Sequence, residues 1–198
     1  MLHLFYFACM NDKKKRCNWC LSDPLYVEYH DNEWGVPEYD DRKLFEMINL
    51  EGAQAGLSWI TVLKKREGYL KAFDNFDAEK IVKYSDKKLE KMRTNPEIIR
   101  NRLKIAAVRS NARIYLDIRE SGISFSDYIW KFVNGKPIVN KFKTMSDIPA
   151  KTEVSERMSK QMKKDGFKFV GPTIVYAFMQ ACGMVNDHVI SCHRYKEC

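Results

Sequence analysis

The chain has 198 residues, of which 45% are hydrophobic and 13% aromatic, and this is enough to bury one core. Its 34 Lys and Arg residues outnumber 26 Asp and Glu residues, and the resulting net charge of +8 attracts polyanions, although a well-solvated basic surface explains it equally well. Six cysteines without a secretory signal argue against a disulfide framework and predict a cytoplasmic protein with free or metal-bound thiols.

The N-terminal segment MLHLFYFACM is apolar, but it is too short to span a bilayer and lacks the charged start of a signal peptide. Neither a membrane segment nor a membrane partner is therefore predicted. We expect residues 1–16 to form an extension that is disordered or that precedes the native start, for which Met10 is the candidate.

Potential metal ligands stand near both ends of the chain. They form two pairs, Cys17 with His30 and His188 with Cys192. One zinc ion bound by all four would join the two ends, because two thiolates and two imidazoles complete a tetrahedral site. Cys20 and His193 leave the ligand set open, since Cys17 and Cys20 by themselves have the spacing of metal ligands.

Helical periodicity dominates the chain. Apolar residues recur at intervals of three and four rather than two, which predicts an all-α fold. Several predicted helices begin at Asp or Ser residues that can cap the first turn. A long irregular connection with Pro137 and Pro149 is expected over 134–154. The predicted helices span 41–54, 58–73, 77–84, 86–93, 102–121, 124–133, 155–166 and 171–182.

Glu51 occupies an unusual place on the first of these helices. Leu44, Ile48 and Glu51 are spaced at i, i+4 and i+7, so the carboxylate projects from the apolar stripe that faces the core. A buried carboxylate needs a cation or hydrogen-bond donors, and a ligand can supply both. The alternative is that the helix frays beside Gly52 and leaves Glu51 in solvent.

Aromatic residues are concentrated in the first sixty residues. Their rings suit a pocket for a flat base or a delocalised cation, and the same rings are also common in a hydrophobic core. The mixture of indoles, phenols and one inward carboxylate favours a pocket. The residues are Trp19, Tyr26, Tyr29, Trp34 and Trp59.

A short turn separates two helices in the middle of the chain. The first helix ends before Asn95 and Pro96, Ile98 lies in the turn, and the second helix starts near Arg102. This pattern resembles a helix-hairpin-helix, in which backbone N–H groups and a helix N-terminus meet a DNA phosphate. Glu97 stands where that motif often has glycine, and an ordinary αα-corner is the alternative.

Long segments of the chain resemble one family. They are DPLYVEYHDNEWGVPEYD, KLFEMINLEGAQAGLSWITVLKKRE, NPEIIRNRLKI and GFKFVGPTIVYAFMQACGMVNDH, together with the two ligand pairs. From Cys17 to about Cys192 the sequence is similar to the DNA-3-methyladenine glycosylase I family of the helix-hairpin-helix superfamily. The resemblance implies an all-α helix-hairpin-helix DNA glycosylase fold whose N- and C-terminal segments are joined by a structural zinc ion.

The resemblance also implies a domain plan and a ligand set. Residues 17–195 are expected to form a single catalytic unit with a helical lobe, about 41–140, and a zinc-stapled lobe built from 17–40 and about 141–195. One Zn²⁺ per chain is expected on four ligands, which are Cys17, His30, His188 and Cys192.

Further site residues follow from the same resemblance. Glu51 is expected to recognise the positively charged base and to take part in catalysis, and Tyr29 and Trp59 are expected to hold the base. Trp34, Tyr26 and Trp19 complete the wall. Expected DNA contacts are made by the turn at Gly56 and Leu57, by Ile98 in the hairpin, and by Arg100, Arg102 and Lys104.

The implied activity is hydrolytic excision of 3-methyladenine from double-stranded DNA, which releases the free base and leaves an abasic site. An enzyme without lyase activity is expected, because no lysine nucleophile is identifiable. Asn111 lies near the usual catalytic Asp and cannot act as a base. A monomer is expected, because the chain has no long heptad or exposed apolar run. Two other classes are a non-catalytic zinc-stabilised DNA-binding regulator and a metal-dependent hydrolase. The latter would need an open coordination position.

Overall fold

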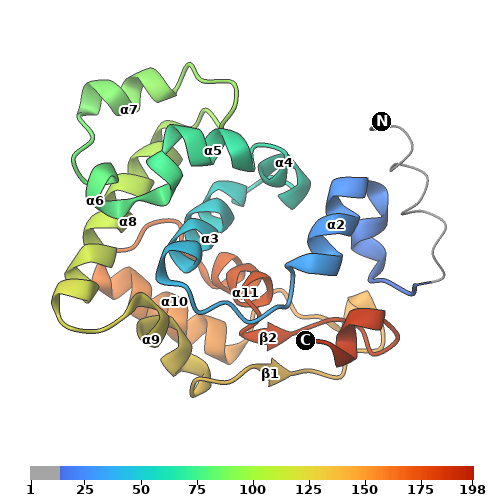
Figure 1. Ribbon diagram of the computed structural model, residues 1–198. Coiled ribbons are helices and arrows are strands. Elements are labelled where there is room, and N and C mark those ends of the chain that lie inside the picture. The colour runs from blue at the N-terminus through green and yellow to red at the C-terminus, as the bar shows by residue number, and fades with distance from the viewer. Residues whose placement is uncertain (1–13) are drawn as a thin grey trace.

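The computed structural model describes residues 14–198, and the regular secondary structure of these residues is almost entirely helical (Figure 1). The predicted all-α class is confirmed. A single two-stranded parallel sheet is present in this part of the chain, formed by β1 (Ile138–Val139) and β2 (Val185–Asn186). The candidate start at Met10 lies outside the described residues. Of the predicted extension only residues 14–16 are described, and Arg16 there forms an ion pair with Asp31.

Most of the α-helices follow one another with short connections, and one long connection precedes the last two. They are α2 (Pro24–Asn32), α3 (Asp41–Gln54), α4 (Trp59–Leu63), α5 (Arg66–Ala72), α6 (Ala78–Ile81), α7 (Asp86–Met92), α8 (Arg102–Glu120), α9 (Phe125–Trp130), α10 (Glu153–Asp165) and α11 (Pro172–Ala181). Single turns of 3₁₀ helix are η1 (Asn18–Ser22), η2 (Asp74–Phe76), η3 (Lys131–Val133), η4 (Met145–Asp147) and η5 (His193–Lys196).

Two sequence predictions need correction. The helix expected over 58–73 is two helices, because the chain leaves helical geometry at Lys65. The break lets Leu63 pack with the N-terminal aromatic residues while Tyr69 packs in the main core. Helix α2 was not predicted, although Pro24 at its first position and the cap from Asp23 to the Leu25 N–H are typical start signals.

The main core surrounds α3, which contacts α4, α8, α9 and α11. Leu44, Phe45 and Ile48 on this helix are at most 1% exposed. In Figure 1, α3 lies at the centre, between α5 above and α11 below. The predicted apolar stripe of the 41–54 helix therefore faces the core, and the end of that stripe carries Glu51 into the interior.

A second, smaller cluster joins the two ends of the chain. It includes Tyr29 and Trp34 from the N-terminal part and Val189 from the C-terminal part, with Cys17 and Cys192 beside them. Figure 1 shows α2 next to the C-terminal segment. No helix in the described part of the chain is both long enough and apolar enough to cross a membrane.

Candidate functional site

A cavity of about 370 Å³ opens between α2, α3, α4 and α11. The structure brings six of the residues singled out in the sequence to its wall, which are Trp19, Tyr26, Tyr29, Trp34, Glu51 and Trp59. Because α2 and α3 are separate helices joined by a short connection, these side chains converge only in the folded chain. The cavity is large enough for a flat heterocyclic ring.

Glu51 is the buried acid of this cavity. Its side chain is 3% exposed, which excludes the frayed-helix alternative. The Oε2 atom has no hydrogen-bond partner among the described residues. Burial alone raises the pKa of this carboxyl to about 8, since no cation near it offsets the desolvation. A cationic ligand would lower that pKa and occupy the free oxygen.

The raised pKa of Glu51 predicts a stability that depends on pH. Between about pH 4.5 and 8 the unfolded chain ionises this carboxyl while the folded chain keeps its proton, so the free energy of unfolding falls as pH rises and levels off above that window. Glu51→Gln removes this fall. Across this pH window the free energy of unfolding of the variant is therefore expected to rise by about 3 to 5 kcal/mol relative to that of the original chain.

Urea unfolding of both proteins at several pH values within and above this window measures the effect. The variant's amide adds a constant offset, so the slope with pH is the informative quantity. Parallel pH profiles would contradict a buried carboxyl that stays protonated near neutral pH.

The aromatic side chains form a rigid wall. Trp19 packs edge-on against Tyr26, with ring centroids 4.9 Å apart, and against Trp34, with centroids 5.1 Å apart. Tyr29 and Trp59 are 5.6 Å apart and tilted by 47°. The Nε1 atom of Trp59 is a buried donor without a partner among the described residues. The cavity thus offers aromatic faces, one free donor and one free acceptor.

Four polar residues of the wall were missed in the sequence. Gln54 follows Glu51 on α3, and Thr173, Tyr176 and Gln180 lie on α11. The α11 residues recur at i, i+3 and i+7, so a polar stripe on an otherwise apolar helix was the available signal. The buried Asp187 accepts hydrogen bonds from the Tyr176 hydroxyl, at 2.5 Å, and from Gln180 Nε2, at 2.8 Å.

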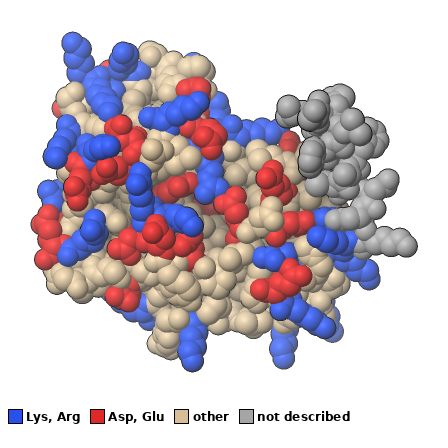
Figure 2. All heavy atoms as spheres, in the orientation of Figure 1, with Lys and Arg blue, Asp and Glu red and all other residues tan. Residues whose placement is uncertain are grey.

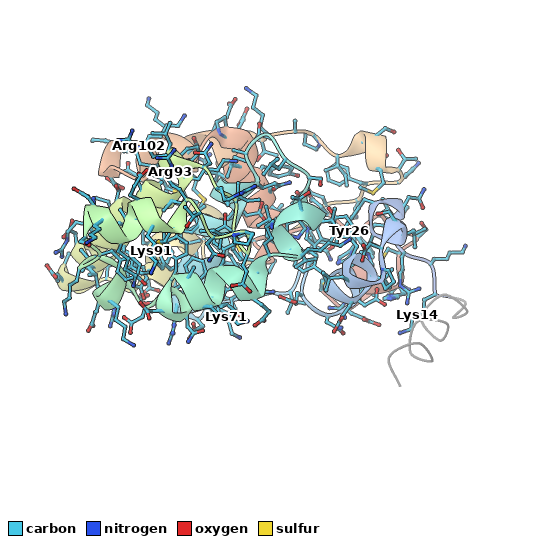
Figure 3. The ribbon with its side chains drawn as sticks, turned by 90° about the horizontal axis from the view of Figure 1, so that it is seen from above. Lys14, Tyr26, Lys71, Lys91, Arg93 and Arg102 are labelled. Atoms are coloured by element: carbon cyan, nitrogen blue, oxygen red, sulfur yellow. The ribbon has the colours of Figure 1, made fainter. Side chains whose placement is uncertain are left out.

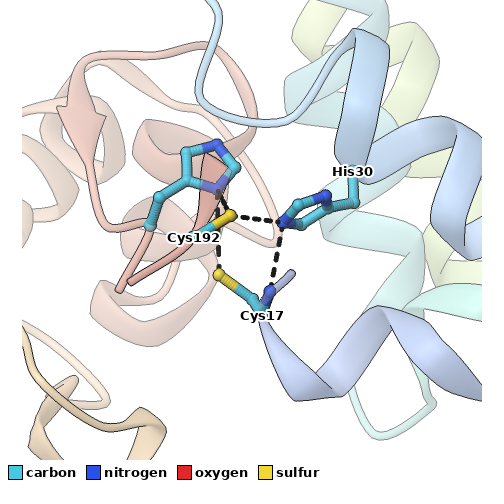
Figure 4. Close-up of side chains that lie close together, drawn as sticks. Cys17, His30 and Cys192 are labelled. Atoms are coloured by element: carbon cyan, nitrogen blue, oxygen red, sulfur yellow. Dashed lines mark hydrogen bonds between the residues drawn. The ribbon is translucent and has the colours of Figure 1, made fainter. Parts of the chain in front are cut away.

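The two predicted ligand pairs meet in one buried cluster (Figure 4). The four ligand atoms of Cys17, His30, His188 and Cys192 all lie within 4.8 Å of one another. Cys192 Sγ is 3.4 Å from His30 Nε2 and 3.5 Å from His188 Nδ1. This set can hold one metal ion and leaves no coordination position for a catalytic water.

The two alternative ligands have other contacts. The thiol of Cys20 donates to the carbonyl oxygen of Cys17 at 3.1 Å. His193 Nε2 lies 3.4 Å from Asp31 Oδ1. Neither residue belongs to the cluster of four.

The outer nitrogens of the two imidazoles fit a metal centre as well. His30 Nδ1 lies 2.7 Å from Asp31 Oδ1, and Arg16 binds the same carboxylate. His188 Nε2 lies 3.0 Å from the carbonyl oxygen of Trp34. Metal-binding histidines characteristically donate their second N–H to such acceptors, which fixes the ring and its tautomer. Since Trp34 also lines the cavity, the cluster supports the cavity wall directly.

The hairpin between α7 and α8 is built on tight backbone contacts. A Cβ on Gly68 of α5 would lie 2.2 Å from the carbonyl oxygen of Glu97, so only glycine allows α5 to approach the turn this closely. Ile98 is 1% exposed and belongs to the core, so its side chain is not available to contact DNA. Asn101 caps α8 by accepting from the N–H groups of Leu103 and Lys104.

Basic side chains surround this hairpin. Arg100 and Arg102 are exposed. In Figure 3, Lys91, Arg93 and Arg102 lie in the half of the molecule away from Lys14. On the face drawn in Figure 2, Lys and Arg gather at the upper left over α7, and both signs alternate elsewhere. Lys104 differs from its neighbours, because its Nζ donates to the carbonyl oxygens of Ala53 and Ala55.

Gly56, Leu57 and Asn111 were also singled out in the sequence. Gly56 has a φ of +77°, in the region that favours glycine, and Leu57 beside it is 41% exposed. Asn111 is 2% exposed and bonds to Asn49 and to the backbone of Lys168. Asn111 is therefore a structural residue that joins α3 and α8 to the segment before α11.

Known proteins with similar sequences agree on one description. The family model for methyladenine glycosylase matches residues 19–195. DNA-3-methyladenine glycosylase 1 of Escherichia coli is 55% identical over 181 residues, which cover 91% of this chain and 97% of that protein. The DNA-3-methyladenine glycosylase of Haemophilus influenzae is 52% identical over 177 residues, covering 89% and 96%.

Solved structures give the same answer. A crystal structure of 3-methyladenine DNA glycosylase I superposes with a TM-score of 0.89 at 54% identity and covers 90% of this chain and 98% of its own. The Staphylococcus aureus enzyme, solved to explain 3-methyladenine recognition, superposes with a TM-score of 0.87 at 37% identity, covering 92% and 97%. The resemblance noted in the sequence is confirmed: the chain belongs to the methyladenine glycosylase family.

Proposed function

We propose that this chain excises 3-methyladenine from alkylated double-stranded DNA by hydrolysing the N-glycosidic bond. The observation that carries this proposal is Glu51, a buried carboxyl with one unpartnered oxygen inside an aromatic cavity. The activity named for the relatives from E. coli and H. influenzae supports it. A nucleotide must leave the double helix to reach such a cavity, as in other enzymes that act on bases.

Charge is the proposed basis of selectivity. Methylation at N3 gives adenine in DNA a positive charge, whereas undamaged adenine is neutral. The carboxylate of Glu51 and the ring faces of Tyr29 and Trp59 stabilise a cation. The methylated base supplies the positive charge that the described residues near Glu51 do not provide. Neutral adenine offers no such compensation, so Glu51 keeps its proton beside it and no charge interaction is gained. Trp19, Tyr26 and Trp34 close the wall around the base.

The proposed reaction needs little chemical assistance. The bond between the sugar C1′ and the base nitrogen breaks with its electron pair going to the base, which neutralises the base's positive charge. A bond forms between C1′ and the oxygen of water, and the water releases one proton. None of the described residues that line the cavity is a lysine. We therefore propose a monofunctional enzyme, because lyase chemistry uses an amine nucleophile.

DNA is proposed to lie across the hairpin and the turn after α3. Backbone N–H groups near Ile98 and the start of α8 face one phosphate, and the exposed Arg100 and Arg102 add positive charge. Leu57, presented by Gly56, is proposed to fill the gap left by the extruded nucleotide.

The metal centre is proposed to hold one structural Zn²⁺. Two thiolates and two imidazoles close its coordination shell, so the ion contributes stability and takes no part in the hydrolysis. This argues against the metal-dependent hydrolase. A monomer in the cytoplasm remains our expectation for the assembly and location of the protein.

Base release from methylated duplex DNA tests the proposed function. Chromatography of the released bases is expected to show 3-methyladenine, with 7-methylguanine retained and the DNA strand unbroken. A folded, metal-loaded protein that releases no base would contradict the proposal and favour the non-catalytic DNA-binding regulator.

A further inference from the structure

Lys104 lies in the first turn of α8, and its ammonium group points toward the end of α3. Its Nζ atom donates to the carbonyl oxygens of Ala53, 2.8 Å away, and Ala55, 2.5 Å away. Both carbonyls lie at the C-terminal end of α3, where a helix lacks intrahelical donors and carries partial negative charge. Burial lowers the pKa of Lys104, and no carboxylate of the described chain offsets that shift. Two carbonyl oxygens therefore bind this partly buried ammonium.

The other end of this connection is fixed in the hairpin. The Oδ1 atom of Asn101 accepts from the N–H groups of Leu103, at 3.0 Å, and Lys104, at 3.1 Å. The backbone that carries Lys104 is thus the first turn of α8, which is the part of the hairpin proposed to face a phosphate. The neighbouring Arg102 is exposed and remains available for DNA.

The segment that Lys104 holds bears two parts of the proposed site. Glu51 lies in the last turn of α3, just before Ala53. Gly56 and Leu57 follow Ala55 directly, and the Leu57 N–H donates to the Gln54 carbonyl at 2.6 Å. The Lys104 ammonium and the Leu57 N–H thus bond to the carbonyl oxygens of residues 53–55, where the chain leaves α3 and enters the turn.

We propose that Lys104 is a positioning residue, which fastens the hairpin helix to the end of α3 and sets Leu57 and Glu51 at a fixed offset from the bound DNA backbone. The inference rests on the proposed function. It assigns Lys104 a task other than the phosphate contact expected from the sequence. A displacement of about 1 Å between two parts of a site can cost on the order of a hundredfold in rate.

The test compares Lys104→Met with Arg102→Met in the full-length, metal-loaded protein. For Lys104→Met, we expect single-turnover release of 3-methyladenine to slow by about tenfold to a hundredfold. The slope of log affinity for undamaged duplex against log salt concentration is expected to stay unchanged. For Arg102→Met, the slope is expected to fall by about one, because a phosphate contact is lost. A slope that falls equally for Lys104→Met would overturn the proposal.

Two further variants separate positioning from charge. Lys104→Gln keeps a neutral donor and is expected to recover part of the rate lost in Lys104→Met, whereas a purely charge-based role predicts no recovery. Leu57→Ala and Lys104→Met are expected to give losses that do not multiply in the double variant, since both act through one turn. Fully multiplicative losses would contradict the link.

The two levels of the proposal fail differently. If the original chain releases no 3-methyladenine, the proposed function is wrong. If it is active and Lys104→Met, confirmed as folded by thermal unfolding, keeps the full rate, only the role of Lys104 is wrong.

Discussion

Glu51→Gln is expected to lower the rate of 3-methyladenine release by about a hundredfold or more. The amide has nearly the same shape as the carboxyl but cannot become an anion, so the cationic base loses the one charged side chain among the described residues that line the cavity. Single-turnover release from methylated duplex measures the loss. Binding of 3-methyladenine is expected to weaken more than binding of undamaged DNA, because only the damaged base contacts Glu51.

Glu46→Gln is the matched control. Glu46 lies on the same helix and is only 9% exposed, but its carboxylate bonds to Arg66 and does not line the cavity. This variant is expected to release the base at the original rate. Equal losses in both variants, or equal weakening of damaged and undamaged DNA by Glu51→Gln, would sink the recognition role of Glu51.

Removal of the metal is expected to lower the melting temperature by about 10 °C. In the proposed centre one ion would join Cys17 and His30 to His188 and Cys192 and so close a loop that spans most of the chain. Such a link contributes about 3 to 5 kcal/mol in the loop-closure model, and a chain of this size loses a few degrees for each kcal/mol. Loss of activity is expected to accompany loosening, because His188 bonds to Trp34 in the cavity wall.

The pair Cys192→Ser and Cys20→Ser tests the ligand set. Cys192→Ser is expected to lose the metal and melt early, whereas Cys20→Ser keeps both, since a hydroxyl can still donate to the Cys17 carbonyl. Elemental analysis gives the metal content and thermal unfolding gives the stability. A melting temperature that chelation leaves unchanged, with activity abolished, would indicate a catalytic ion instead.

The sequence by itself determined the helical class and the family, and it predicted an inward Glu51 with a frayed helix end as the alternative that burial in the structure excludes. These features are local or repeated: the three-and-four spacing of apolar residues predicts helices, and Leu44 and Ile48 orient Glu51 along one stripe of α3. The ligand pairs were also visible, because two thiolates and two imidazoles complete a tetrahedral metal site. The spacing did not decide whether Cys20 or His193 belongs to the ligand set. In the structure neither residue is part of the cluster of four.

Only the tertiary structure decided how distant segments combine. The break at Lys65, the polar stripe of α11 in the cavity and the inward turn of Lys104 all depend on contacts between helices far apart in the chain. Lys104 shows the reason most clearly. The cations nearest to it in the sequence, Arg100 and Arg102, are exposed, and nothing local distinguishes Lys104 from them. The carbonyl oxygens at the end of α3, which have no donor within the helix, accept hydrogen bonds from its ammonium. The packing of the helices, rather than the local sequence, sets the position of these oxygens.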